Sequence, residues 1–237
     1  MVYIRSILFS LWMIISALTI STLSILFWPL PVIWRVRLIG SYGLAAIFML
    51  KHICRIEYTV EGKENIPKET SIIFCKHQST WETLALQLYF PPQTFVIKRQ
   101  LLFIPFFGWG LAAMDPVAID RSAGRNAIKQ IVKQGINRLN KGLWIVIFPE
   151  GTRGRPGQKM KYKIGGAILA AESGYPVVPV AHNAGSFWPK GQFLKHPGKI
   201  TMVIGPTITT RERKAEEILS DSEKWIEEQM KRIQPIQ

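Results

Sequence analysis

The chain has 237 residues, with 30 Lys and Arg against 16 Asp and Glu, which gives a formal net charge of +14. This length allows one substantial hydrophobic core and an appendage, and the charge implies an anionic partner such as nucleic acid, anionic lipid or a phosphorylated substrate. The hydrophobic share of 48% is high for a soluble basic protein and favours a membrane. The two cysteines, Cys54 and Cys75, form no CxxC pattern, so reduced thiols are expected rather than a disulfide framework.

The N-terminal region is strongly apolar. Residues 6–34 carry no charge, and residues 7–28 alone would span about 33 Å as a helix, roughly the thickness of a bilayer core. A second uncharged stretch, 38–50, is too short to span. Two geometries fit: a spanning helix followed by a helix on the surface, or a re-entrant hairpin in one leaflet. Two soluble core helices are the disfavoured alternative.

Residues 1–53 are therefore expected to anchor the chain, and residues 54–237 to form the globular domain. Arg5 lies before the apolar region, whereas Arg35, Arg37 and Lys51 follow it. This excess of positive charge favours a cytoplasmic position for the bulk of the chain.

Strand and helix patterns alternate through the rest of the chain. Apolar and β-branched runs predict strands at 55–62, 71–75, 94–98, 116–120, 143–148, 176–180 and 199–205. Helical spacing predicts helices at 83–89, 123–139, 165–172 and 211–233. Such alternation is typical of an α/β domain with a mostly parallel sheet flanked by helices. No internal repeat, low-complexity tract or second-domain linker interrupts it.

A potential general-base pair follows the strand predicted at 71–75. His77 ends that strand, and Glu82 lies five positions on, in the sequence Lys-His-Gln-Ser-Thr-Trp-Glu. Five residues rotate a helix by roughly 500°, so the two side chains meet only if His77 precedes the helix and Glu82 lies in its first turn. The alternative is a capping box, in which Ser79 caps the helix and Glu82 reaches back to the Ser79 amide. On these residues alone, capping is the commoner role.

The strand predicted at 143–148 runs directly into Phe-Pro-Glu-Gly-Thr-Arg at 148–153. Loops at the carboxyl ends of strands are where α/β sheets place ligands. Gly151 lets the backbone approach a ligand closely, and Arg153 offers a planar fork for two phosphate oxygens. A solvated basic turn is the alternative. The junction with a buried strand favours an anion-binding loop.

Two further strand ends carry cations. Lys98 and Arg99 precede the apolar run 101–109, which fits either an anion contact beside an apolar wall or a turn with a buried aromatic cluster. Arg121 follows the strand at 116–120, where it either contributes to an anion site or pairs with Asp120. The residues alone leave both choices open.

Taken together, these stretches resemble the glycerolipid acyltransferase family, and most closely its bacterial 1-acyl-sn-glycerol-3-phosphate acyltransferases. The family's four blocks occur here in the same order, as His-x4-acid at 77–82, a Lys block with Pro and Gly at 98–108, Phe-Pro-Glu-Gly-Thr-Arg at 148–153 and a Val-Pro block at 177–180. The resemblance covers about residues 50–210, and the apolar N-terminus also looks like that family's membrane anchor. One departure is Glu82, because the usual acid is Asp.

The resemblance implies an enzyme that moves a fatty acyl group from acyl-CoA or acyl-acyl carrier protein to the free hydroxyl of 1-acyl-glycerol-3-phosphate, giving phosphatidate. His77 would be the general base and Glu82 its orienting partner. The donor thioester would be a co-substrate, with no metal and no other cofactor. No covalent acyl-enzyme on Cys75 is expected, and His52, His182 and His196 look incidental.

The resemblance also implies how the lysophospholipid acceptor is held. Arg153 and Lys98 would bind its phosphate, with Glu150, Gly151 and Thr152 shaping the pocket and Arg99 and Arg121 as further anion contacts. The expected location is the bacterial inner membrane, in contact with its lipids and with the catalytic domain facing the cytoplasm.

Other functions remain as alternatives at this level. The acceptor could be glycerol 3-phosphate or another lysolipid, or the chain could be a non-catalytic membrane protein that binds anionic lipid. Nucleic-acid binding is disfavoured, because the basic residues are spread through the chain and no recognition signature appears.

Overall fold

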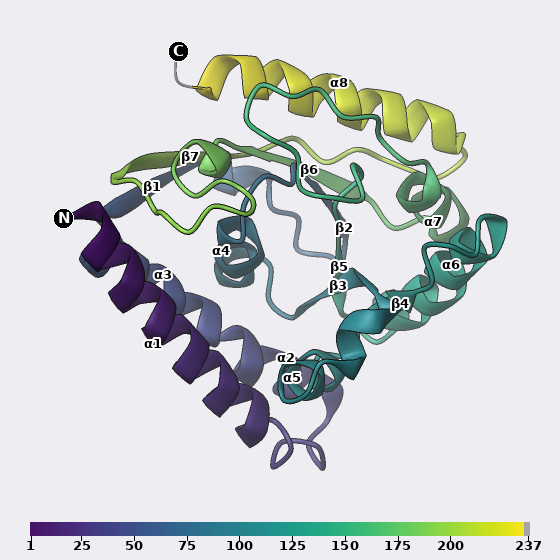
Figure 1. Ribbon diagram of the computed structural model, residues 1–237. Helices are drawn as coiled ribbons and strands as arrows, with labels where there is room; N and C mark the ends of the chain where they lie inside the picture. Colours follow the sequence, from purple (N-terminus) through teal and green to yellow (C-terminus); the bar gives the residue numbers. More distant parts are fainter. Residues whose placement is uncertain (235–237) are drawn as a thin grey trace.

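In the computed structural model, which describes residues 1–234, seven strands form one mixed sheet in the order β1–β7–β6–β2–β5–β3–β4 (Figure 1). The strands are β1 (Ile56–Glu61), β2 (Ile72–Cys75), β3 (Gln93–Lys98), β4 (Val117–Ile119), β5 (Trp144–Ile147), β6 (Val177–His182) and β7 (Gly198–Ile204). Neighbouring strands are parallel except for the antiparallel pair β6 and β7. The predicted α/β class with a mostly parallel sheet is confirmed.

The central strands are short and apolar because both of their faces are covered. Every residue of β2 and β5 is buried. Along β2, Ile73 and Cys75 pack in one core cluster, whereas Ile72 and Phe74 pack in the other. This period of two divides the sheet into two faces, each with its own helical layer.

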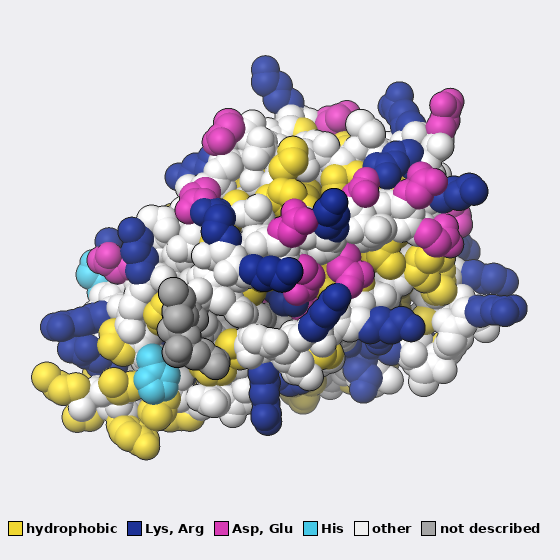
Figure 2. All heavy atoms as spheres, turned by 90° about the horizontal axis from the view of Figure 1, so that it is seen from above, with side chains coloured by type: hydrophobic (Ala, Val, Ile, Leu, Met, Phe, Trp, Pro, Cys, Tyr) yellow, Lys and Arg dark blue, Asp and Glu magenta, His cyan; other side chains and the backbone are white. Residues whose placement is uncertain are grey.

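The helices sort onto these two faces (Figure 1). One layer contains α4 (Trp81–Tyr89) and the N-terminal helices, and the opposite layer contains α6 (Arg125–Asn140), α7 (Gly165–Ser173) and α8 (Ala215–Ile233). An apolar stripe of α8 is buried against α7 and β6, through Ile218, Ile226, Met230 and Ile233. Its outer face carries charges of both signs (Figure 2). Short 3-10 turns span Lys63–Asn65 (η1), Arg99–Phe103 (η2) and Ala184–Ser186 (η3).

The N-terminal region forms a helical hairpin of α1 (Val2–Leu23) against α2 (Val32–Gly40) and α3 (Tyr42–Cys54). The arrangement is antiparallel, since Cys54 lies beside Arg5 and Tyr42 beside Ser16. By length and composition, residues 2–23 and 32–54 could each cross a membrane. Only 17% and 33% of their apolar windows are buried, which separates them from the core helices of a soluble protein.

Helix α1 contacts the globular domain near both of its ends. The Phe9 ring meets the Trp188 ring edge to face at 5.6 Å, and Ser21 packs against Gly110, where an added Cβ would lie 2.7 Å from the Ser21 hydroxyl. Ser6 is fully buried and accepts a hydrogen bond from the Lys195 amide. The helix therefore lies along the domain.

Lys195 contacts both α1 and the globular domain at this interface. Its side chain is almost entirely buried, its ammonium donates to the Ser10 hydroxyl at 2.6 Å, and it lies over the rings of Phe9, Trp188 and Phe193. The aromatic faces and the hydroxyl partly replace the water that this cation has lost.

The apolar run 101–109 forms η2 and α5 (Phe107–Ala113). Its aromatic side chains are not a buried cluster: Phe103 is 76% exposed, and Phe106 and Trp109 are also exposed. Phe106 adjoins α1 at Leu23, so this loop extends the apolar surface of the N-terminal hairpin.

Candidate active site

The proposed catalytic pair is assembled where β2 ends and α4 begins. His77 follows β2, Glu82 lies in the first turn of α4, and His77 Nδ1 is 2.8 Å from Glu82 Oε1. This is the geometry that the spacing required. With Nδ1 bonded to Glu82, the ring nitrogen left for chemistry is Nε2.

Glu82 is also the acid of a capping box. Its Oε1 accepts the backbone N–H groups of Gln78 and Ser79, both at 2.9 Å, while the Ser79 hydroxyl accepts the N–H of Trp81. A single oxygen of Glu82 therefore both orients His77 and caps the start of α4. Burial raises the pKa of Glu82, but His182, His77 and the Ser79 amide outweigh it, and the pKa lies below its ordinary value. The carboxylate stays ionised.

The second oxygen of Glu82 faces His182, which is fully buried at the end of β6. Oε2 has no hydrogen-bond partner in the described residues and lies 3.7 Å from His182 Nε2. That nitrogen is 2.8 Å from the Lys76 carbonyl oxygen, and Nδ1 accepts the N–H of Ala184, which assigns the proton to Nε2 of a neutral ring. Burial lowers the pKa of His182, which agrees with this assignment.

His182 was expected to be incidental, yet it contacts the proposed pair. The strand register could have revealed this, because Cys75 pairs with Val180 across β2 and β6. His77 and His182 each lie two residues beyond that pair, so they reach the same edge of the sheet.

Phe148, directly after β5, holds the ring of His77 from one side. The two rings stack at 3.8 Å with an interplanar angle of 13°. Glu82 thus fixes the edge of the imidazole and Phe148 fixes its plane.

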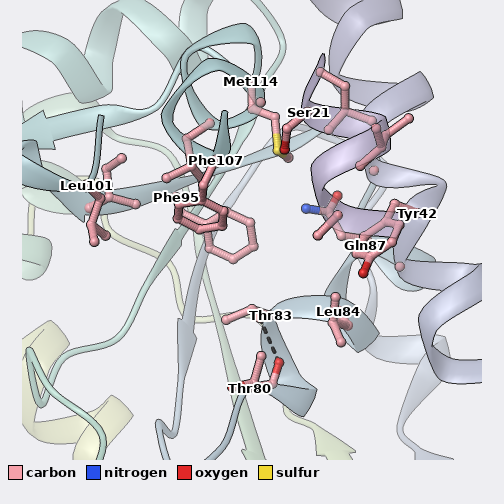
Figure 3. Close-up of a pocket in the computed structure, with 18 of the residues that line it drawn as sticks. Ser21, Tyr42, Thr80, Thr83, Leu84, Gln87, Phe95, Leu101, Phe107 and Met114 are labelled. Carbon is pink, nitrogen blue, oxygen red and sulfur yellow. Dashed lines mark hydrogen bonds between the residues drawn. The ribbon is translucent and has the colours of Figure 1, made fainter. Parts of the chain in front are cut away.

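The pair lies at the polar end of an apolar cavity of about 340 Å³. Helices α1, α3, α4 and α5 and strand β3 form its walls, as Figure 3 shows with Ser21, Tyr42, Leu84, Phe95, Leu101, Phe107 and Met114. Its polar residues near the sheet are His77, Thr80 and Arg153. An alkyl chain fits this lining, with its reactive end at His77.

Arg153 projects toward the same end of the cavity. Its guanidinium donates to the Thr80 hydroxyl at 3.0 Å. The loop that carries it is fixed, because the Gly154 N–H donates to the His77 carbonyl and the Lys190 ammonium donates to the Arg153 carbonyl at 2.9 Å and to the Thr152 hydroxyl at 3.3 Å. No pattern in the sequence indicated this role for Lys190.

Glu150 was expected to shape the phosphate pocket. The structure places it behind His77, 2% exposed and outside the cavity lining. Its Oε2 accepts the His77 N–H at 2.9 Å, and its Oε1 forms an ion pair with Lys76 Nζ at 2.7 Å. Its contacts are therefore with the backbone of the histidine.

The remaining predicted anion contacts lie at the ends of β3 and β4. Arg121 donates to the Gly151 carbonyl and lines a second cavity of about 260 Å³, and Lys98 and Arg99 are exposed at the end of β3. Asp120 bonds to Ser122, through the Ser122 amide and hydroxyl, rather than to Arg121.

Comparison with known proteins agrees with this geometry. A family profile described as "Acyltransferase" matches residues 57–183, more than half of the chain. A curated 1-acyl-sn-glycerol-3-phosphate acyltransferase from Pseudomonas aeruginosa is 46% identical over 99% of this chain and 93% of its own length. The chain belongs to the acyltransferase family. The resemblance inferred from the four sequence blocks is confirmed.

Two further relatives of this acyltransferase extend the comparison. A Saccharomyces cerevisiae protein with the same description is 33% identical over 56% of this chain and 45% of its own length. The crystal structure of the 1-acyl-sn-glycerophosphate acyltransferase PlsC from Thermotoga maritima aligns over 98% of this chain and 97% of that one, with a TM-score of 0.80 and 23% identity. That similarity includes the N-terminal hairpin, so the whole fold is shared.

Proposed function

We propose that this acyltransferase transfers a fatty acyl group from an acyl thioester to the free hydroxyl of 1-acyl-glycerol-3-phosphate, giving phosphatidate. The observation that carries the proposal is the position of His77: Glu82 and Phe148 fix its ring, and Nε2 is left at the polar end of an apolar cavity beside Arg153. The descriptions of the relatives support this acceptor.

In the proposed reaction, His77 Nε2 takes the proton of the acceptor hydroxyl as its oxygen attacks the thioester carbonyl. Collapse of the tetrahedral intermediate breaks the C–S bond, and the imidazolium returns the proton to the leaving thiolate. Glu82 stabilises the imidazolium and keeps Nδ1 protonated. General base catalysis of this kind contributes about 10²–10⁴-fold.

The acyl group passes directly from donor to acceptor. Cys75 is two residues from His77, but its thiol is fully buried and donates to the Lys76 carbonyl. Burial raises the pKa of Cys75 well above its ordinary value, and Glu82 and Glu150 raise it further. A thiol so strongly kept protonated is a poor nucleophile.

We assign the acceptor phosphate to Arg153, which already bonds to Thr80 at the cavity. A guanidinium binds two phosphate oxygens with charge-assisted hydrogen bonds. We assign the attraction of anionic substrates to this edge of the sheet to Lys98, Arg99 and Arg121, at the ends of β3 and β4. Both acyl-CoA and acyl-acyl carrier protein are anionic donors that this charge suits.

We propose that the hairpin holds the site at a membrane surface. The outward side chains of α1 are exposed and apolar, as are those of the loop 103–109, whereas the opposite side of α1 docks on the domain. A helix held along its length in this way lies in one leaflet. We propose the cytoplasmic leaflet of a bacterial inner membrane, where lysolipid and product both reside.

The direct test is thiol release from oleoyl-CoA by purified protein in micelles that contain lysophosphatidate. Wild type should turn over, and His77→Ala should lose at least about 10²-fold in kcat. His196→Ala, an exposed histidine, is the matched control and should keep wild-type activity.

Acceptor and donor are varied in the same assay. Monoacylglycerol, which lacks the phosphate, should be acylated far more slowly than lysophosphatidate; equal rates would refute the assigned acceptor. An inactive wild type would be assayed again with acyl-acyl carrier protein. Full activity of His77→Ala would refute the mechanism.

A further inference from the structure

A lysine is buried directly before the proposed catalytic histidine. Lys76 is only 2% exposed, and its ammonium lies 2.7 Å from a carboxylate oxygen of Glu150 and 2.7 Å from one of Glu227. A buried ammonium is strongly destabilising unless it is paired and hydrogen-bonded. Two carboxylates from distant parts of the chain supply that pairing.

One of these carboxylates comes from the C-terminal helix. Glu227 lies on α8, 151 residues from Lys76 and outside the part of the chain that the family profile matches. The ammonium satisfies hydrogen-bond geometry toward Glu227, whereas its contact with Glu150 is an ion pair. Tyr162, which is also buried, donates its hydroxyl to the same oxygen of Glu227 at 3.1 Å. Glu227 therefore helps to fix the position of the ammonium from α8.

Lys76 and Glu150 together hold the backbone of His77. Glu150 uses its other oxygen to accept the His77 N–H at 2.9 Å, and the Gly154 N–H donates to the His77 carbonyl at 2.9 Å. The Lys76 carbonyl is held by His182 at 2.8 Å. The bond from the His77 amide to the Glu150 carboxylate is charge-assisted. A shift of Lys76 would be transmitted to both sides of the histidine.

We propose that Glu227 is a positioning residue for the acyl transfer: through Lys76 and Glu150 it fixes the backbone from which His77 reaches the substrate. The inference rests on the proposed role of His77 as the base. Docking of α8 does not need this carboxylate, because Ile218, Ile226, Met230 and Ile233 already bury its apolar stripe. A misplacement of about 1 Å at a catalytic group can cost 10²-fold in rate.

The test is Glu227→Gln, which keeps the shape and removes the charge. We expect kcat to fall about tenfold, with KM for both donor and acceptor within about twofold of wild type, because the substrates do not touch this network. Glu228→Gln, an exposed carboxylate on the same helix, is the matched control and should leave kcat unchanged. Ile226→Val, which only trims the buried stripe, reports what weaker docking of α8 does by itself.

A double variant separates positioning from general stability. If Glu227 acts through Lys76, then Glu227→Gln should not lower kcat any further in the Lys76→Met background. The proposal is overturned if Glu227→Gln keeps kcat, if its effect adds fully to that of Lys76→Met, or if Ile226→Val at an equal loss of Tm loses kcat equally. An active wild type with an inactive His77→Ala shows that the proposed function stands whichever result is found.

Discussion

The imidazole of His77 meets the carboxylate of Glu82 at an oxygen that already accepts two backbone N–H groups, with a Nδ1–Oε1 distance of 2.8 Å. These two N–H groups, from Gln78 and Ser79, hold the longer side chain of Glu82 against the turn. The chain thereby accommodates Glu82, which is one methylene longer than the aspartate that the resemblance led us to expect. The same bonds make the start of α4 depend on the carboxylate that orients the base.

Replacement of Glu82 by glutamine should therefore affect both catalysis and folding. Glu82→Gln removes the charge that stabilises the imidazolium, and we expect kcat to fall about 10²-fold or more, as in other base–carboxylate pairs. Loss of a cap costs about 1 kcal/mol, so Tm should also fall. Steady-state kinetics and thermal unfolding check the two effects, with the exposed Glu64→Gln as control. If the Glu82→Gln variant kept the kcat of wild type, Glu82 would act only as a helix cap.

Arg153 should affect the acceptor rather than the chemistry. A hydrogen bond to a charged group contributes about 1.5–3 kcal/mol, so Arg153→Ala should raise KM for lysophosphatidate by roughly 10–100-fold and leave KM for the donor unchanged. Arg153→Lys should recover only part of the loss, because it lacks the planar fork. Arg155→Ala, in the next turn, controls for lost surface charge. A fall in kcat alone would place Arg153 at the reacting carbonyl instead.

The apolar cavity should set the length of the chain that it holds. Leu111 lies on α5 and lines the cavity between α1 and β3. Leu111→Trp fills part of its volume of about 340 Å³, so the preferred donor should become shorter. Competition between acyl-CoA donors of different lengths measures this, and Leu111→Met, which nearly conserves volume, should leave the preference unchanged. An unaltered preference in the tryptophan variant would show that another surface holds the donor chain.

Acidification should destabilise the protein through His182. Burial lowers the pKa of this ring, which packs against Glu82, His77 and the Lys76 carbonyl, below its ordinary value of 6.5. The unfolded state then binds the extra proton first, so the free energy of unfolding falls as pH drops below about 6.5. The contribution of Glu82, whose pKa is lowered from 4.5, is lost only at lower pH. Thermal unfolding from pH 7 to 5 should therefore show a smaller drop in Tm for His182→Gln than for wild type; equal drops would contradict this.

Much of the fold followed from local patterns. The apolar runs and helical spacings predicted every strand of the sheet and helices α4, α6, α7 and α8, because these elements bury continuous or periodic apolar faces. The capping box and the five-residue spacing together placed His77 before α4 and Glu82 within it. These features depend on neighbours in the sequence.

The contacts behind the site depend on neighbours in space. Lys76, just after β2, contacts His182 of β6 through its carbonyl and Glu227 of α8 through its ammonium. These contacts are determined by the order of the strands and the docking of α8. Lys98 and Arg153 come from the ends of β3 and β5, and motif order does not say how their side chains are directed.

The hairpin at the N-terminus is more than an attachment to lipid. Helices α1 and α3 supply one wall of the substrate cavity, and Ser10 of α1 supplies the hydroxyl that the buried ammonium of Lys195 bonds. Removing residues 1–54 to obtain a soluble enzyme would open that cavity to water. It would also leave the Lys195 ammonium without the Ser10 hydroxyl, beside the aromatic rings of Trp188 and Phe193. The N-terminal hairpin and the catalytic domain thus pack as a single structural unit. The detergent or lipid that solubilises the hairpin will therefore influence any activity assay of the catalytic domain.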